Sequence, residues 1–180
     1  PYLNKIKKSN VKKTILWGAG VDTFMDIKNL LGHKKVDLYG DYFDFIDDVG
    51  IRVYSSLQKY SYVPCVSCMS NLFFKYRAIK PNHLLGYYFH KDVPFEKTLD
   101  KEFAPTATNY GNNLEEKLKF LSNSEYIVTN SYHGVYWATL LERKVICIPF
   151  KSGLMSFKHP PAYSLDGLVI NGGDFDINPE

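Results

Sequence analysis

The chain has 180 residues, a net charge of +3 and a hydrophobic fraction of 45%, which suits one substantial domain or two small lobes that share a cleft. The mild charge argues against nucleic acid as a partner, and no apolar run approaches the roughly 18 residues of a transmembrane segment. Three cysteines do not make a secreted disulfide framework and no secretory signal is visible, so we expect a cytoplasmic protein.

The first predicted element is a strand that ends in a glycine turn. Residues 14–17 are apolar, Gly18-Ala19-Gly20 follows them, and apolar residues at helical spacing then predict a helix over 22–31. Glycines allow the backbone to approach a ligand closely, and the start of a helix offers free N–H groups to an anion. Gly18 and Gly20 are therefore candidate substrate-binding residues, although a tight turn alone explains the same pattern.

The middle of the chain carries weaker signals. Apolar runs predict short strands over 36–39 and 51–54, and helical spacing predicts a helix over 71–79. Pro81-Asn82 is typical of a boundary between lobes. We accordingly expect two domains, an incomplete N-terminal Rossmann-like lobe of residues 1–80 and a C-terminal Rossmann-like lobe of residues 81–180.

The C-terminal half alternates strands and helices over short connections. Such βαβ units make parallel sheets with right-handed crossovers, so the predicted fold class is α/β with Rossmann-like parallel sheets. The expected elements are a strand over 83–90, a loop-rich stretch over 91–113, a helix capped by Asn113, a strand over 126–129, a polar loop over 130–134, a helix over 135–142, a strand over 145–149, and loops from Lys151 onward.

The polar loop over 130–134 is the second candidate site, because ligands of parallel sheets lie beyond the carboxyl ends of the strands. His133 can donate a proton or hold a negative charge, so it is the candidate catalytic residue. Ser131 can donate to a phosphate or carboxylate, and Gly134 allows the chain to pass close to a ligand. With Asn130 they form the candidate substrate-binding group. A purely structural histidine is the alternative.

Several segments resemble the polysaccharide pyruvyl transferase family. Glu125 to Phe150 is similar to the family's strand, its (S/R)-x-H-G motif, its apolar helix and its following strand. Ile15 to Gly20 resembles the family's W-G-x-G turn, and Gly50-Ile51-Arg52 resembles its G-x-R-D segment. The segment from His83 to His90 resembles the strand that opens the second lobe.

The resemblance implies a two-lobed, glycosyltransferase-B-like architecture and a transferase of cell-surface polysaccharide synthesis. Such an enzyme moves a pyruvyl group from phosphoenolpyruvate to a glycan sugar, lipid-linked acceptors included, without a further cofactor. His133 would be the proton donor, and Arg52 and Ser131 would hold phosphate or carboxylate. The chain is shorter than full members and starts with Pro1, so we expect the first lobe to be truncated.

The chain also departs from the family pattern. Many members have arginine where Ser131 stands, and Val53 replaces the usual acidic residue after Arg52. Lys151 and Lys158 are candidates to supply the lost positive charge. Two alternatives remain open: a glycosyltransferase that uses a nucleotide sugar, and a non-catalytic accessory binding module.

Other chemistry-bearing residues give weaker signals. Cys65-Val66-Ser67-Cys68 has CxxC spacing, but zinc needs about four ligands and no second pair follows. A redox CxxC usually opens a helix in a thioredoxin context, which the sequence does not indicate, so we expect a structural loop near the cleft and no metal site. His159 is a second-rank site candidate. The early lysines are a solvated lead-in or a contact to the inner face of the membrane.

Overall fold

The computed structural model describes residues 12–20, 43–54, 60–93, 104–165 and 168–170. The helix expected over 22–31 and the strand expected over 36–39 lie outside these residues. The strands are β1 (Ile15–Ala19), β2 (Asp48–Ile51), β3 (Ser61–Tyr62), β4 (His83–Phe89), β5 (Thr106–Thr108), β6 (Ser124–Thr129), β7 (Lys144–Cys147), β8 (Ala162–Leu165) and β9 (Leu168–Ile170). The α-helices are α3 (Leu72–Arg77), α4 (Leu114–Ser122) and α5 (Tyr132–Leu140), and the 3₁₀ helices are η1 (Val66–Met69) and η2 (Ser152–Leu154).

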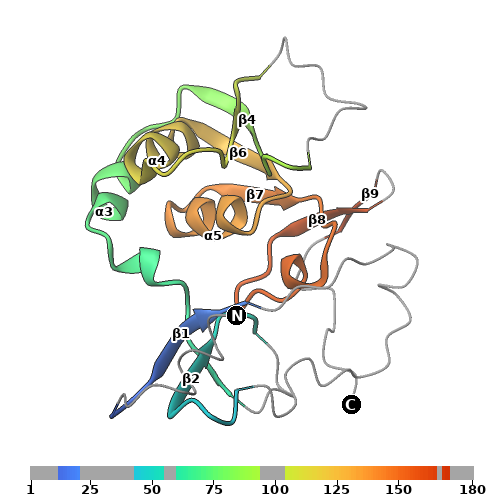
Figure 1. Ribbon diagram of the computed structural model, residues 1–180. Helices are drawn as coiled ribbons and strands as arrows, with labels where there is room; N and C mark the ends of the chain where they lie inside the picture. The colour runs from blue at the N-terminus through green and yellow to red at the C-terminus, as the bar shows by residue number, and fades with distance from the viewer. Residues whose placement is uncertain (1–11, 21–42, 55–59, 94–103, 166–167, 171–180) are drawn as a thin grey trace.

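Two parallel sheets build the fold, which confirms the expected α/β class with parallel strands. The small sheet has the order β1-β2-β3, and the large sheet has the order β5-β4-β6-β7-β8-β9. All neighbours pair in parallel except β8 and β9, which are antiparallel. The small sheet lies below the large one in Figure 1, and α5 lies between β7 and the small sheet.

The large sheet is buried on both faces, because successive residues of a strand point to opposite sides. Tyr88 and Ile127 pack with α3, α4 and α5 in the main hydrophobic cluster. Tyr87 and Val128, one residue away in each strand, belong to a second cluster on the other face with Ala104. This double burial is typical of parallel sheets and explains why β4 and β6 read as nearly continuous apolar runs.

Several boundaries differ from the expectation. The strand predicted over 51–54 ends at Ile51. The Arg52 amide still bonds the Ala19 carbonyl of β1 at 2.8 Å, but the Tyr54 amide bonds the Ser156 carbonyl at 2.9 Å. The chain thus leaves the small sheet after Arg52. The loops expected over 91–113 and from Lys151 contain three short strands, β5, β8 and β9.

The helix after β6 begins three residues earlier than expected, at Tyr132 rather than Val135. Ser131 is its N-cap, and its hydroxyl accepts a hydrogen bond from the Gly134 amide at 3.4 Å. A serine in this place satisfies one of the unpaired N–H groups of the first turn. His133 and Gly134 are therefore helical residues and not members of a loop.

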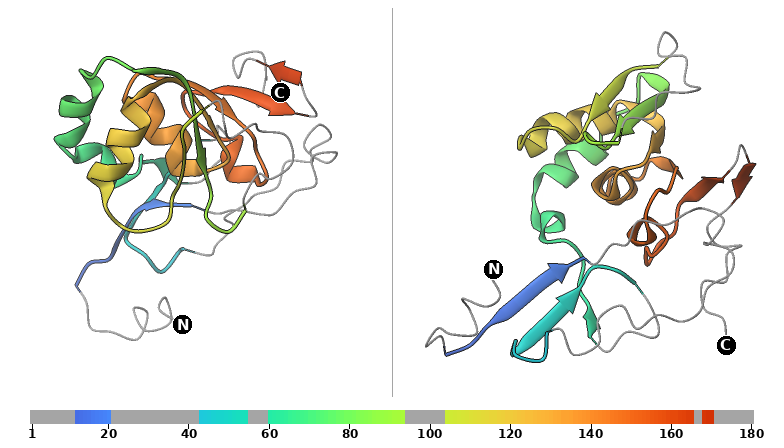
Figure 2. Two further views of the ribbon diagram at one scale, coloured as in Figure 1. Left: turned by 90° about the horizontal axis from the view of Figure 1, so that it is seen from above. Right: turned by 45° about the vertical axis from the view of Figure 1, so that its right-hand side comes forward.

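The segment η1–α3 connects the small sheet to the large one (Figure 2). Phe73 and Tyr76 of α3 lie in the main hydrophobic cluster of the large sheet. The Arg143 guanidinium donates to the Ile79 carbonyl at 2.7 Å. Because Ile79 follows α3 and Arg143 follows α5, this bond connects the C-terminal ends of the two helices. The lobe boundary near Pro81 stays a prediction, and α3 packs with the C-terminal side of it. In the described part of the chain, no helix is long and apolar enough to cross a membrane.

Gly134 brings α5 unusually close to the large sheet. A Cβ atom at this position would clash with the Thr129 hydroxyl and would lie 2.8 Å from Cδ1 of Tyr88. Both neighbours are fully buried, so neither has room to move away. The glycine therefore sets the distance between the first turn of α5 and strands β4 and β6.

We predict that Gly134→Ala destabilises the fold by about 1–3 kcal/mol, the usual cost of overpacking a core. Helix propensity alone would stabilise the variant by about 1 kcal/mol, so the sign of the change separates the two effects. Urea unfolding of wild type and variant measures it. An unchanged or raised stability would show that the close approach does not constrain α5.

Candidate functional site

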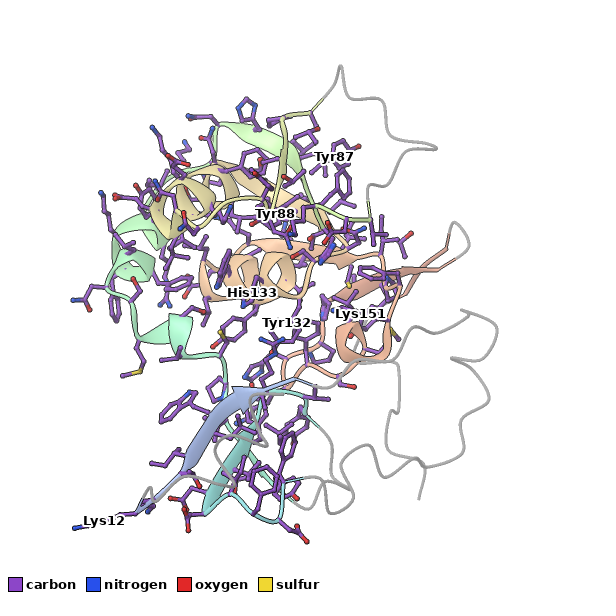
Figure 3. The ribbon with its side chains drawn as sticks, viewed as in Figure 1. Lys12, Tyr87, Tyr88, Tyr132, His133 and Lys151 are labelled. Atoms are coloured by element: carbon purple, nitrogen blue, oxygen red, sulfur yellow. The ribbon has the colours of Figure 1, made fainter. Side chains whose placement is uncertain are left out.

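The candidate site lies where the first turn of α5 meets residues that follow the strands of the small sheet. Gly20 follows β1, Arg52 follows β2, and Cys65 comes three residues after β3. Tyr132 and His133 lie on the side of α5 turned toward the small sheet (Figure 3). Carboxyl ends of parallel strands are the usual place of ligands in such folds.

His133 contacts the small-sheet side directly. Its Nε2 lies 3.5 Å from Sγ of Cys65, and its ring packs against the Trp137 indole with centroids 4.7 Å apart. The Tyr132 ring meets it edge-on at 5.6 Å. The histidine is half-buried, so its imidazole is oriented by neighbours and still reaches the surface.

The sulfur of Cys65 is the polar group that contacts this histidine. The Ser67 hydroxyl donates to the same sulfur at 3.3 Å. The hydrogen bond with His133, followed by those from Ser67, lowers the pKa of Cys65 to about 6 against the opposing effect of burial. At neutral pH the thiol is therefore largely ionised, next to a side chain able to carry a proton.

Arg52 lies one aromatic ring away from His133. Its guanidinium carbon is 4.7 Å from the centroid of the Tyr132 ring, and no carboxylate pairs with it among the residues that the structure describes. A Cβ atom on Gly20 would lie 2.6 Å from the Arg52 Nε. The missing side chain of Gly20 is what leaves room for this guanidinium.

Gly18 has a different role from Gly20. Its φ of +60° is in the left-handed region that glycine adopts readily, and a Cβ atom there would lie 3.2 Å from the Pro64 carbonyl oxygen. The Trp17 indole donates to the same carbonyl at 3.1 Å. The glycine bend thus packs against the segment that carries Cys65. The bend and His133 therefore contact the same segment.

Hydrogen bonds from α5 tie the helix to the small-sheet side. The donors are three aromatic side chains on one helical face, and the acceptors are two carbonyls and a hydroxyl. They are Tyr132 Oη to the Arg52 carbonyl at 3.1 Å, Tyr136 Oη to the Cys65 carbonyl at 3.2 Å, and Trp137 Nε1 to the Ser67 hydroxyl at 2.9 Å. We call this set the α5 seam.

Asn130 and Ser131 are engaged in holding the backbone. The Asn130 side chain accepts from the His90 amide at 2.7 Å and donates to the Val93 carbonyl at 2.7 Å. Ser131 caps α5, and its hydroxyl also accepts a hydrogen bond from the Asn109 side-chain nitrogen Nδ2 at 3.5 Å. Both side chains are almost completely buried. Their predicted contact with a substrate stays a prediction, and so does that of Gly134, which packs against Thr129 and Tyr88.

A small cavity of about 50 Å³ opens beside the α5 seam. Tyr62 and Tyr136 line it together with Lys158 and His159, and Nζ of Lys158 lies 5.8 Å from the centroid of the Tyr62 ring. The second-rank candidate His159 therefore shares this cavity with Tyr136 of α5, and His133 is not among the residues that line it. Lys151 contacts Phe150 instead, with Nζ 5.6 Å from the ring centroid.

Gly20 lies against Arg52, and Arg52 packs on Tyr132, the neighbour of His133. Gly18 lies against the Pro64–Cys65 backbone, and Cys65 contacts His133. That these residues form a shared binding site stays a prediction. Cys65, Tyr132 and Tyr136 were not predicted as site residues. CxxC spacing was the one signal for Cys65, and nothing local in the sequence pairs it with a histidine 68 positions later. Within the described ranges, no group of three His, Cys, Asp or Glu side chains is placed to hold a metal ion.

We predict that His133→Ala moves the pH midpoint of Cys65 alkylation from about 6 in the wild type to about 8.5, the ordinary value for a thiol. The histidine is the largest cause of the lowered pKa, so Ser67→Ala moves the midpoint less. Iodoacetamide labelling followed by peptide mass spectrometry measures it, with the buried Cys147 as internal reference. Equal midpoints in wild type and His133→Ala would contradict the pairing.

Comparison with known proteins adds an independent line of argument. The family model described as polysaccharide pyruvyl transferase matches residues 2–152, a range that includes the glycine turn, Arg52, Cys65 and the start of α5. No curated protein and no solved structure gave a match. The family description implies a pyruvyl donor and a polysaccharide acceptor. Because the match covers most of its length, the chain belongs to the polysaccharide pyruvyl transferase family.

Proposed function

We propose that this protein transfers the pyruvyl group of phosphoenolpyruvate to a sugar of a cell-surface glycan, where it forms a cyclic ketal, and releases phosphate. The observation that supports this most is the contact of His133 with Cys65 at 3.5 Å, next to a guanidinium that no described carboxylate neutralises. A proton donor beside a free cation is what the polyanionic donor and its reaction require.

The reaction needs an acid at one carbon of the donor. A proton adds to the terminal methylene carbon of phosphoenolpyruvate, and a sugar hydroxyl oxygen bonds to the adjacent carbon. Phosphate then leaves, and a second hydroxyl of the same sugar closes the ketal. We assign the proton to His133, because contacts with Cys65 and Trp137 orient its half-buried imidazole, and histidine is the commonest general acid.

Arg52 is the proposed anion ligand. A planar guanidinium binds carboxylate or phosphate through two parallel hydrogen bonds, and the packing of this one against Tyr132 and Gly20 fixes its plane. Ser131 contributes by capping α5, since the first turn of a helix offers N–H groups to anions. Many members carry arginine at this position, and here a serine that caps α5 takes its place.

The setting of the enzyme follows from the same argument. An odd count of three cysteines does not make a secreted disulfide framework and suits a reducing compartment. We therefore place the protein in the cytoplasm, at the inner face of the membrane when its acceptor is lipid-linked. The two-lobed, glycosyltransferase-B-like arrangement belongs to this proposal, with lobes over 1–80 and 81–180.

The proposal is tested with purified protein, phosphoenolpyruvate and a glycan fragment that carries two neighbouring free hydroxyls. We predict phosphate release together with a gain in mass of the acceptor. His133→Gln should lower turnover about 10²- to 10⁴-fold, the usual share of a general acid, while the melting shift caused by phosphoenolpyruvate is kept. Stabilisation by nucleotide sugars alone would favour a glycosyltransferase, and binding without turnover would favour an accessory module.

We predict that Arg52→Gln raises the KM for phosphoenolpyruvate about 10- to 100-fold, which corresponds to the loss of a charged hydrogen-bond pair. Arg52→Lys keeps the charge and loses the planar fork, so its KM should fall between those of wild type and Arg52→Gln. Lys75→Gln on the exposed surface of α3, remote from the α5 seam, is the matched control. Steady-state kinetics decides: a KM that Arg52→Gln leaves unchanged would remove this residue from the donor site.

A further inference from the structure

Two cysteines lie one turn apart beside the α5 seam, and the proposed function assigns a role to Cys65 alone. Cys65 is the N-cap of η1, and Cys68 lies in that helix. The Cys68 amide bonds the Cys65 carbonyl at 3.2 Å. The CxxC motif therefore opens a helix, a feature that the sequence did not indicate, and its first cysteine contacts His133.

The turn that opens η1 brings the backbones of the two cysteines together. The Cys68 amide bonds the Cys65 carbonyl at 3.2 Å, and the two end Cα atoms of such a turn lie within about 7 Å of each other. Disulfides span about 4.4–6.8 Å between Cα atoms. Cys65 is the N-cap, with φ −59° and ψ 131°, so closure of the pair requires its side chain to rotate from His133 toward Cys68.

The two thiols differ in their neighbours, as the attacking and resolving members of a pair do. Cys65 interacts with His133 Nε2 at 3.5 Å and with the Ser67 hydroxyl at 3.3 Å, and both contacts stabilise its thiolate. Cys68 interacts with the hydroxyl of Tyr136, whose pKa is raised first by burial and then by this contact. Cys147, by contrast, is fully buried, which raises its pKa and keeps it inert.

We propose that Cys65 and Cys68 form a peroxide-reactive dithiol that closes to a disulfide and thereby releases His133. The Cys65 thiolate attacks one oxygen of a hydroperoxide, which breaks the O–O bond and leaves a sulfenic acid. The Cys68 thiol then attacks that sulfur and expels water. The peroxide is reduced, the two thiols are oxidised, and their protons leave in the products.

The disulfide has a consequence for the proposed transferase. A disulfide sulfur carries no charge and turns toward Cys68, so it no longer pairs with the imidazole. His133 Nε2 then loses its 3.5 Å contact with that sulfur and the orientation that the contact gives the ring. This step rests on the proposed function, whereas the thiol chemistry does not.

The first experiment measures the thiols alone. Purified full chain is treated with hydrogen peroxide at neutral pH, and peptide mass spectrometry follows each cysteine. We expect an intramolecular Cys65–Cys68 disulfide, formed at least 10-fold faster than any oxidation of Cys147. In Cys68→Ser, dimedone should trap the sulfenic acid at Cys65, and His133→Ala should slow the oxidation. Two intact thiols, or oxidation that spares Cys65 until Cys147 reacts, would overturn the proposal.

The second experiment measures the consequence. We expect peroxide to lower pyruvyl transfer at least 10-fold and dithiothreitol to restore it, while Cys68→Ser loses activity without recovery by dithiothreitol once Cys65 is overoxidised. A disulfide that leaves transfer unchanged would overturn the release of His133. If no transfer is found in untreated protein, the proposed function fails, and the thiol measurements still decide the dithiol proposal.

Discussion

The close approach of α5 to the large sheet is the constraint on which the rest of the site depends. Gly134 allows it, because any side chain there would meet the Thr129 hydroxyl and the Tyr88 ring. Thr129 in turn accepts the Ser131 amide at 3.0 Å, which fixes the residue that caps the helix. The helix axis and its starting residue are thus both set by the strand that precedes it. His133 is the second residue of the helix, so the position of the helix sets the direction of its side chain.

Given that direction, the α5 seam decides what His133 meets. Tyr132, Tyr136 and Trp137 each anchor the helix to a different point after β2 or β3. The ends of two separate sheets are thereby held together by aromatic side chains whose polar tips bond and whose rings pack, a role that tyrosine and tryptophan fill well. The high aromatic content of the chain is partly explained by this seam. A histidine and a cysteine far apart in sequence become partners because the seam holds α5 against the segment that carries Cys65.

Sequence patterns located most of the described elements of the fold. β1, β4, α4 and β6 follow from apolar periodicity, and the Asn113 cap is confirmed by its bond to the Glu116 amide at 3.3 Å. The prediction of loops from Lys151 onward is wrong, because β8 and β9 lie in this stretch and pair in antiparallel. The start of α5 was missed because a polar run reads equally as a loop and as a capped first turn. The Cys65–His133 contact depends on how two sheets meet, which no local pattern encodes.

The candidate ligands at the end of β6 illustrate a general limit of such predictions. Polar side chains at the carboxyl end of a strand suggest a binding site. The backbone also turns there, however, and its buried N–H and C=O groups need hydrogen-bond partners. Asn130 and Ser131 meet that demand here, through bonds to His90, Val93 and Gly134. In the proposed function, their burial leaves the anion to be bound by Arg52 from the other sheet and by the first turn of α5. Such a divided site would need both sheets held in place, so the proposed chemistry would depend on the α5 seam and on the oxidation state of the thiols beside it.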